Sequence, residues 1–261
     1  MRQSRSYAPM SVSPQQDETL AEMVRVSGSE GRDAVAVFDL DGCVFDNRPR
    51  IIRIFRELAS RHGAADLFRI APEHFADWNQ DDTMRRAGIS EARVAALHPD
   101  FLKQFFLQFF SSEFCAYDHA MPGAARHVWD CYRAGASIVY LTGRHDEMRP
   151  GTEKALRDWG FPFHRPRTTL ITKPDLTVVD EQFKVEAIRE IELLGKPVLF
   201  VDNEPANVNV FHAARPDAMT VWVKSDHSPR PIGAHPDVPA IRGFLRVGDP
   251  GADPLVDLAA G

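Results

Sequence analysis

Acidic side chains accompany two short apolar runs of the chain, at places where they could act in catalysis. Residues 34–40 form a run of strand length that contains Asp39 and leads directly into Asp41, and a second run at residues 198–201 is followed by Asp202. Because alternate side chains of an extended chain point the same way, Asp39 and Asp41 are expected on one side of it. Such carboxylates could supply a nucleophile, a proton donor and oxygen ligands for a hard divalent cation.

A hydroxyl group and a lysine extend this set of reactive groups. Thr142 and Gly143 follow the apolar run at residues 137–141. The hydroxyl could hydrogen-bond to a phosphoryl oxygen, and the glycine would let the backbone come close to it. Lys184 opens the helix predicted before residue 198 and would add a positive charge, with Lys173 as the alternative for that role.

Together these residue types match what the hydrolysis of a phosphate monoester requires. The negative oxygens of the ester repel a nucleophile, so catalysis needs a positioned nucleophile, a cation and an acid for the leaving oxygen. Asp39 could attack phosphorus, while Asp41 protonates the leaving group and then activates water. A hard cation, most plausibly Mg²⁺, would be held by Asp39 and Asp202.

The elements that must position these residues alternate along the chain. Short apolar runs predict strands at residues 34–40, 137–141, 198–201 and 219–223, with a weaker one at 168–171. Apolar residues at helical spacing predict helices at residues 122–134, 152–160 and 181–194. This order predicts an α/β fold with a doubly wound, Rossmann-like parallel sheet, in which ligands bind at the carboxyl ends of the strands.

One segment interrupts the alternation. Residues 48–121 contain no convincing strand, and their length is that of a small helical module. Apolar residues at helical spacing between positions 51 and 58 predict an amphipathic helix, and phenylalanines between positions 101 and 110 predict another, within a phenylalanine-rich stretch at residues 101–114. We interpret the phenylalanines as the core of this module, with a pocket wall or a dimer surface as alternatives.

These patterns predict how the chain divides. Residues 34–47 and 122–224 are expected to form the core, and residues 48–121 an inserted α-helical cap domain. Residues 1–33 are expected to be a flexible N-terminal extension. Residues 225–261, rich in proline, glycine and aspartate, are expected to be a loop-rich C-terminal tail.

In this order the motifs resemble those of the haloacid dehalogenase superfamily, whose phosphatases carry a DxD strand end, a threonine strand end, a helical lysine and an acidic strand end. The resemblance covers roughly residues 34–223, with the insertion where that superfamily carries a helical cap. It implies an aspartyl-phosphate intermediate on Asp39 and a Mg²⁺ ion held by Asp39, Asp202 and the backbone carbonyl of Asp41. The implied contacts to the substrate phosphate come from Thr142, Gly143 and Lys184.

The chain also departs from the pattern of that superfamily. Asn203 follows Asp202 where many relatives have a second carboxylate, so either Glu204 or a water oriented by Asn203 would complete the metal shell. Cys43 stands where threonine or valine is common, and we interpret it as a packing residue. Asp46 and Asn47 lie where the chain enters the cap and could form a polar hinge or contact substrate.

Within this resemblance, the residue two positions after the nucleophile separates the reactions. Dehalogenases lack an acid there, and transport ATPases have threonine, so Asp41 indicates a phosphatase. A phosphomutase and a non-catalytic protein that binds phosphorylated ligands remain alternatives. The expected partner is a small phosphorylated metabolite whose identity, like the oligomeric state, the sequence does not reveal. Arg144, next to the threonine motif, is expected to form structural ion pairs.

Composition limits the other classes of function. The 31 Lys and Arg against 37 Asp and Glu give a net charge of −6, which disfavours nucleic acid as a partner. Three cysteines without a CxxC pair indicate neither a disulfide framework nor a thiolate zinc site, and fit a reducing compartment. Because no apolar run resembles a signal peptide or a membrane span, we expect no membrane partner and a cytoplasmic protein.

Overall fold

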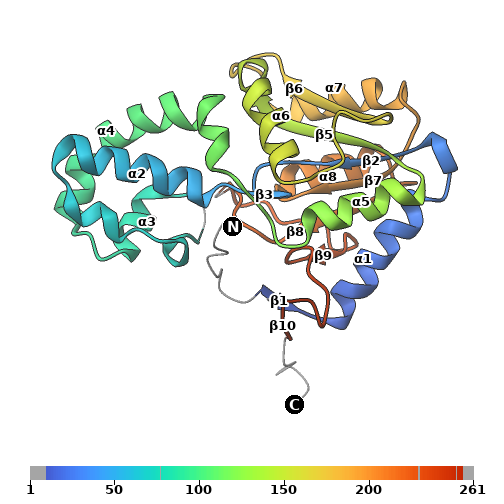
Figure 1. Ribbon diagram of the computed structural model, residues 1–261, viewed down its shortest axis with the longest axis horizontal. Helices are drawn as coiled ribbons and strands as arrows, with labels where there is room; N and C mark the ends of the chain where they lie inside the picture. The colour runs from blue at the N-terminus through green and yellow to red at the C-terminus, as the bar shows by residue number, and fades with distance from the viewer. Residues whose placement is uncertain (1–9, 77, 229, 251, 255–261) are drawn as a thin grey trace.

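A six-stranded parallel sheet forms the centre of the molecule in a computed structural model that describes residues 10–76, 78–228, 230–250 and 252–254 (Figure 1). The strand order is β6-β5-β2-β7-β8-β9. The strands are β2 (Ala34–Phe38), β5 (Ser137–His145), β6 (Thr168–Lys173), β7 (Lys196–Asp202), β8 (Met219–Val223) and β9 (Ala240–Ile241). All five predicted strands are confirmed. The edge strand β9 was not predicted, because two residues after a proline carry no strand pattern.

Helices cover both faces of this sheet. Side chains of Ala36 and Phe38 pack with the helices of one face, and those of Val35 and Val37 with the helices of the other, because neighbouring strand residues point to opposite sides. One face carries α1 (Pro14–Ser27), α5 (Ala124–Ala134) and α6 (Arg149–Asp158), and the other carries α7 (Asp180–Glu192) and α8 (Pro205–Ala214). The doubly wound α/β fold predicted from the sequence is thereby confirmed.

Both ends of the described chain contribute to the core, which differs from the expected division. The N-terminal extension was expected to be flexible, but α1 packs on the sheet with Leu20 and Met23 fully buried. Its mostly polar residues hide the helix from a hydrophobicity pattern, although Ser13 caps it by accepting a hydrogen bond from the Gln16 amide at 3.2 Å. The C-terminal tail is loop-rich, yet it buries Phe244 against the same layer. The short strands β1 (Met10–Val12) and β10 (Ala252–Pro254) pair with each other.

The inserted segment forms a helical cap beside the core, at the left of Figure 1. Its hydrophobic cluster is separate from those of the core and includes Phe55, Leu58, Phe101 and Phe109. Its helices are α2 (Arg48–His62), α3 (Gln80–Arg86) and α4 (Glu91–Phe109), with short 3₁₀ turns η2 (Ala65–Arg69), η3 (Pro72–His74) and η4 (Glu113–Tyr117). Further 3₁₀ turns in the core are η1 (Gly31–Asp33) and η5 (Asp146–Met148).

The two connections between cap and core run side by side. Strand β3 (Phe45–Asp46) leads into the cap, and strand β4 (His119–Ala120) leads out of it. They form an antiparallel pair in which Phe45 lies opposite Ala120 and Asp46 lies opposite His119. The cap is therefore attached to the core through one short two-stranded junction.

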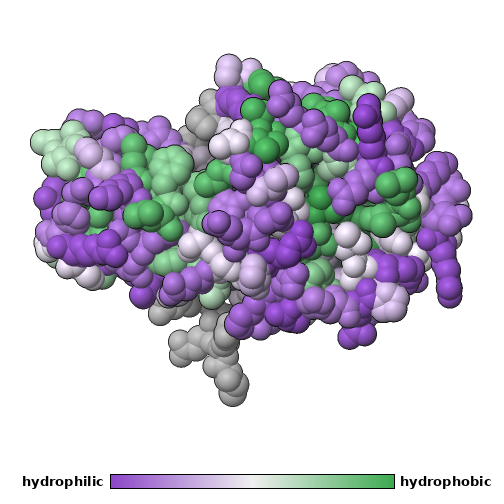
Figure 2. Space-filling view, turned by 90° about the horizontal axis from the view of Figure 1, so that it is seen from above, coloured by the Kyte–Doolittle hydropathy of each residue, from purple (hydrophilic) through white to green (hydrophobic). Residues whose placement is uncertain are grey.

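The order of the strands determines where a ligand can bind. From β2 the chain moves outward through β5 and β6, then returns to the other side of β2 through β7 and β8. Where a parallel sheet changes direction in this way, a crevice opens at the carboxyl ends of its central strands. On the face in Figure 2, hydrophobic patches are scattered among hydrophilic residues over both cap and core. No helix among the described residues combines the length and the apolar character needed to cross a membrane.

Candidate active site

A lysine joins two aspartates at the carboxyl ends of the central strands. Asp39 directly follows β2, where its amide donates to the Val201 carbonyl of β7 at 2.9 Å, and Asp202 ends β7. Lys184 reaches them from the second turn of α7, with its Nζ 2.6 Å from Asp39 Oδ1 and 2.6 Å from Asp202 Oδ2. All three side chains are buried. The fold thus brings together three residues that lie far apart in sequence.

The charges of this group shift its protonation equilibria. Burial raises the pKa of Asp39 well above its usual value, although the charge of Lys184 opposes this. Burial would lower the pKa of Lys184, but Asp202 and Asp39 outweigh it and raise the pKa above its usual value. Lys184 is therefore a permanent cation between the side chains of Asp39 and Asp202. Lys173, the alternative lysine, instead bonds Asp180 at 2.5 Å.

The turn after Asp39 depends on a glycine. Gly42 has φ +75° and lies so close to Asn203 that a Cβ atom there would meet the amide nitrogen of Asn203 at 2.3 Å. Only glycine combines this backbone conformation with this close approach. The Gly42 amide donates to the Phe45 carbonyl at 2.9 Å and to Asn47 Oδ1 at 3.0 Å. These bonds fix the loop that carries Asp41.

Asp41 lies in a cluster of charges that the core shares with the cap. Arg144 binds its carboxylate with two nitrogens, Nη2 at 2.6 Å and Nε at 2.9 Å, and Asn47 Nδ2 donates to it at 2.7 Å. Asp118, which precedes β4, accepts from Arg144 at 2.7 Å. It also accepts from Arg50 of α2, whose Nε lies 2.7 Å away. Two arginines and two aspartates compensate one another, as buried charges must.

This cluster determines the ionisation of Asp41. Burial raises its pKa, but the charges of Arg144 and Arg50, with hydrogen bonds from Arg144 and Asn47, lower the pKa to about 2. Asp41 is therefore a carboxylate at neutral pH while the ion pair with Arg144 is intact. The structural ion pairs expected of Arg144 are present.

The threonine motif lies at an irregularity in β5. The pairing of β5 with β6 shifts register between Thr142 and His145, which turns Gly143 out of the regular ladder. Thr142 is fully buried, and its hydroxyl accepts from the Arg144 amide at 3.2 Å. Gly143 lines the same cavity as Asp39. A Cβ at Gly143 would stand 3.1 Å from the carboxylate of Asp180, so the glycine keeps this wall of the cavity open.

The donor set around Asp39 suits a hard divalent cation. Asp39 and Asp202 offer carboxylate oxygens, the ligands that Mg²⁺ prefers. Asn203 is 1% exposed, and its Oδ1 has no hydrogen-bond partner within the described residues, while its Nδ2 donates to the Asp226 carbonyl at 2.7 Å. An unpaired buried carbonyl oxygen beside two carboxylates fits a cation ligand, directly or through water. The residues present therefore fit the implied metal.

The other secondary candidates have structural partners. Glu204 lines the cavity that contains Asp39, but its carboxylate accepts from the amide and the hydroxyl of Ser228, each at 2.7 Å, and so holds the loop that carries Ser228. Asp46 binds Arg48, with Oδ1 2.8 Å from the arginine Nε. Cys43 is fully buried, and burial raises the pKa of its thiol, in keeping with a packing role.

Two cavities between cap and core open at these residues. The one that contains Asp39 and Lys184 has a volume of about 250 Å³, and the cap lines it with Trp78, Phe109 and Phe110. A larger space of about 570 Å³ adjoins it, also lined by Trp78. The larger space lacks Asp39, so the smaller one is the candidate reaction chamber.

Several residues of the site were not predicted from the sequence. Arg50, in the first turn of α2, and Asp118, just before β4, both join the charge cluster around Asp41, and no local pattern predicts these contacts. Asn207, in the first turn of α8, donates to both carboxylate oxygens of Asp202, at 3.2 and 3.3 Å. The sequence did carry a signal for Asn207. Pro205 marks the start of a helix shortly after the acidic strand end, and Asn207 lies in the first turn of that helix.

Comparison with known proteins gives matches only among solved structures. No family model matches the sequence, and no curated protein matches it. A protein from Clostridium difficile named as a phosphatase has a TM-score of 0.48 and 13% identity, over 76% of this chain and 87% of its own. A haloacid dehalogenase-like hydrolase from Burkholderia xenovorans has a TM-score of 0.48 and 18% identity, over 84% and 94%. Protein tyrosine kinase A from Mycobacterium tuberculosis has a TM-score of 0.49 and 18% identity, over 81% and 94%.

Solved structures that match most of the chain thus include haloacid dehalogenase-like hydrolases and phosphatases, at low sequence identity. The six-stranded sheet with its helical insertion is the arrangement of core and cap that was expected from the sequence motifs. At these identities and TM-scores they carry no information on substrate or mechanism, so the chemistry below is inferred from the site itself.

Proposed function

We propose that this protein is a Mg²⁺-dependent phosphatase that hydrolyses a small phosphate monoester through an aspartyl-phosphate on Asp39. The observation that carries the proposal is the bridge of Lys184 between Asp39 and Asp202 at the sheet's switch point, with each contact at 2.6 Å. One lysine compensates only one of two buried carboxylates, and the negative charge that remains favours a bound cation, as is typical of a functional site. Bound Mg²⁺ would supply further positive charge for the phosphoryl oxygens.

The first step transfers the phosphoryl group to the protein. An oxygen of Asp39 attacks phosphorus, and the bond between phosphorus and the leaving oxygen breaks with its electron pair on that oxygen. The leaving oxygen takes a proton from Asp41. The Thr142 hydroxyl and the Lys184 ammonium hydrogen-bond to phosphoryl oxygens and orient the group.

The second step returns Asp39 to its starting state. Water attacks the phosphorus of the aspartyl-phosphate and gives its proton to Asp41. The bond between phosphorus and Asp39 breaks, which regenerates the carboxylate and releases inorganic phosphate. Asp41 thus alternates between acid and base and ends the cycle as it began.

Asp41 can act as an acid only when Arg144 releases it. Their bidentate ion pair keeps the carboxylate ionised, with a pKa of about 2. Because Arg50 of the cap and Asp118 of the junction belong to the same cluster, movement of the cap is a route to loosening that pair. The proposed acid is therefore coupled to the position of the cap.

The chamber supports a small substrate. A volume of about 250 Å³ holds a phosphate group with a compact organic part, and the rings of Trp78, Phe109 and Phe110 form the wall on the cap side. Such a wall favours an ester whose organic part has some apolar surface. A small phosphorylated metabolite is the substrate class that fits.

The test compares wild type with Asp39→Asn, which keeps the shape of the side chain but removes the nucleophile. Wild type should release phosphate from an aryl phosphate only when Mg²⁺ is added, and hydroxylamine should trap an acyl-phosphate. Asp39→Asn should lose both by several orders of magnitude. Asp158→Asn, which alters a surface aspartate that pairs with Lys154, is the control. Near-normal turnover by a folded Asp39→Asn protein would exclude the mechanism. If wild type releases no phosphate, the alternative of a non-catalytic protein that binds phosphorylated ligands is favoured.

A further inference from the structure

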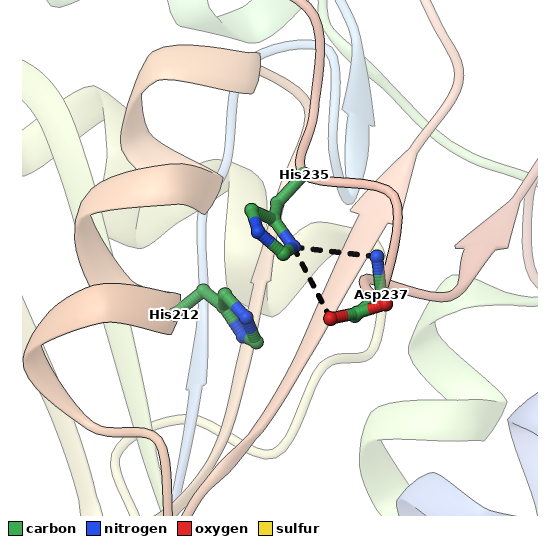
Figure 3. Close-up of side chains that lie close together, drawn as sticks. All are labelled: His212, His235 and Asp237. Atoms are coloured by element: carbon green, nitrogen blue, oxygen red, sulfur yellow. Dashed lines mark hydrogen bonds and ion pairs between the residues drawn. The ribbon is translucent and has the colours of Figure 1, made fainter.

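We propose a second metal site, specific for a nitrogen-seeking divalent ion such as Zn²⁺, formed by His212, His235 and Asp237 on the surface of the core (Figure 3). One ligand atom from each residue lies within 4.8 Å of those of the other two. The two imidazole rings lie close together, with 4.8 Å between their centroids. Two imidazoles and one carboxylate, with a fourth position open to water, are a donor set that zinc takes in proteins.

A cation fits between the groups that already face one another. The His235 Nδ1 lies 3.7 Å from Asp237 Oδ2 and accepts the Asp237 amide hydrogen at 3.3 Å. As an acceptor this nitrogen carries a lone pair, which a metal ion would take in place of the Asp237 amide hydrogen. Zinc bonds of about 2.0–2.2 Å would draw the three donor atoms together by about an ångström. The side chains of His235 and Asp237 are 47% and 80% exposed, so they can rotate to make this adjustment.

The backbone around the cluster is held in place by a residue outside it. Asn209, one turn before His212 in α8, donates to the Gly233 carbonyl at 2.9 Å and accepts from the His235 amide at 2.8 Å. These two bonds fix the approach of the loop to the helix in the absence of any ion. Binding would then cost little ordering of the backbone, because the site is already assembled.

The ligand chemistry separates this site from the one at Asp39. Mg²⁺ binds oxygen ligands and has little preference for imidazole, whereas zinc binds imidazole nitrogen well. The carboxylate pair of Asp39 and Asp202 and the histidine pair should therefore select different ions. Saturating Mg²⁺ would fill the first site and leave the second available to zinc.

A metal ion bound by this cluster would join two segments that border the reaction chamber. His235 and Asp237 belong to the connection between β8 and β9, whose earlier part contacts the reaction chamber through Ser228 and Glu204. His212 belongs to α8, whose first turn carries Asn207 beside Asp202. An ion that joins the two would fasten this connection to the helix behind the site. The proposed site is therefore structural, and it stabilises one wall of the chamber.

The test titrates the whole protein with Zn²⁺ in excess Mg²⁺ by calorimetry, and with Co²⁺ by visible absorption. Wild type should bind one Zn²⁺ and give the intense absorption of four-coordinate Co²⁺. H212A and H235A should each weaken Zn²⁺ binding at least tenfold and lose that absorption. H98A is the matched control, because His98 also faces a carboxylate, with Nδ1 2.8 Å from Asp81, but belongs to no group of three such ligands in the described chain.

Thermal melting gives an independent readout. Zn²⁺ should raise the Tm of wild type and of H98A, and should leave the Tm of H212A and H235A unchanged, because an ion stabilises only the state that binds it. Hydrogen exchange in the part of the β8–β9 connection near His235 should slow when Zn²⁺ is added. No stoichiometric binding by wild type, or equal binding by wild type and both cluster variants, would overturn the proposal.

Discussion

Asp41 must meet two opposing demands if it is the acid and base of the reaction. Its ion pair with Arg144 keeps it in place, with a nitrogen to oxygen distance of 2.6 Å, but also lowers its pKa to about 2 and so removes the proton it has to donate. A carboxylic acid at neutral pH needs the opposite environment, one that disfavours its charge. Replacement of Arg144 should therefore alter the pH dependence of catalysis more than it alters the maximal rate.

We expect Arg144→Gln to move the basic limb of the kcat/KM profile to higher pH. The acid form of Asp41 is lost as pH rises through its pKa, and removal of the guanidinium raises that pKa, because burial then dominates. A shift of about one unit or more would correspond to at least about 1.4 kcal/mol. Arg149→Gln, in which a nearby arginine that bonds Thr172 is changed, should leave the limb in place. An unmoved limb in a folded Arg144→Gln protein would contradict the role of the ion pair.

Replacing Asp41 itself should discriminate between leaving groups. An alkoxide needs a proton as it departs, whereas an activated aryl oxide hardly does, so Asp41→Asn should cost on the order of 10²-fold or more on an alkyl phosphate and less on an aryl phosphate. The measurement is the single-turnover rate of aspartyl-phosphate formation on both substrates. Equal losses on the two would show that Asp41 serves the fold and not proton transfer.

Sequence reasoning located the residues at strand ends better than those of the charge cluster. Asp39, Thr142 and Asp202 were predictable because parallel strands bring their carboxyl ends to one edge of the sheet. Arg50 and Asp118 were not, because Arg50 reaches Asp41 across the entry to the cap, and Asp118 joins the cluster only where the chain returns to the core. Asn203 was identified as a departure, but only the structure reveals its unpaired buried oxygen.

At the scale of elements, helix α4 both builds the cap and borders the chamber. Phe101 and Phe109 are buried in the cap's cluster, Phe110 just after the helix lines the chamber, and Phe106 is 60% exposed. The interpretation of the phenylalanines as the cap's core is therefore correct for some of them, and a pocket wall, the alternative, describes Phe110. The spacing of the phenylalanines in the sequence could not show which of them pack inside the cap and which line the chamber, because the helix buries more than one face.

Phe110→Ala should change which substrates are preferred while sparing the phosphoryl chemistry. The loss of an aromatic wall should raise KM up to about tenfold, or about 1.4 kcal/mol, for a substrate that contacts it. Mg²⁺ dependence and trapping of the acyl-phosphate should persist. Phe106→Ala is the matched control, since Phe106 stacks on Phe110, with 5.9 Å between ring centroids, but does not line the chamber. If both variants rank a panel of phosphate esters as wild type does, the cap wall does not select substrate.

At the scale of the whole molecule, a buried histidine connects the packing of the C-terminal segment to acid stability. His127 in α5 is 2% exposed and faces Phe244 of the C-terminal segment, with 5.5 Å between ring centroids. Burial, with the charges of Arg246 and Arg126, lowers its pKa to about 3 from the usual 6.5. The folded protein therefore keeps this histidine neutral at a pH where the unfolded chain protonates it.

Stability should consequently fall as pH decreases from about 6.5 towards 3, because the unfolded state then binds the additional proton. One group contributes up to about 1.4 kcal/mol per pH unit, so about 2 kcal/mol is lost between pH 6.5 and pH 5. In His127→Leu this part of the loss should disappear. The measurement is urea unfolding at both pH values, with His98→Leu as the control. The same pH dependence in His127→Leu and wild type would contradict this assignment.

The junction of β3 and β4 makes the cap an exchangeable module. Its entry and exit lie opposite each other as a single antiparallel pair, so another helical segment could be spliced between Asp46 and His119 without redirecting the core. New substrate ranges could then arise by recombination of caps onto a conserved chemical scaffold, in place of gradual change within one cap. The cluster at Asp41 restricts which grafts would work. A transplanted cap would have to bring an equivalent of Arg50, together with Asp118 at its exit, or leave Arg144 and Asp41 to pair without them.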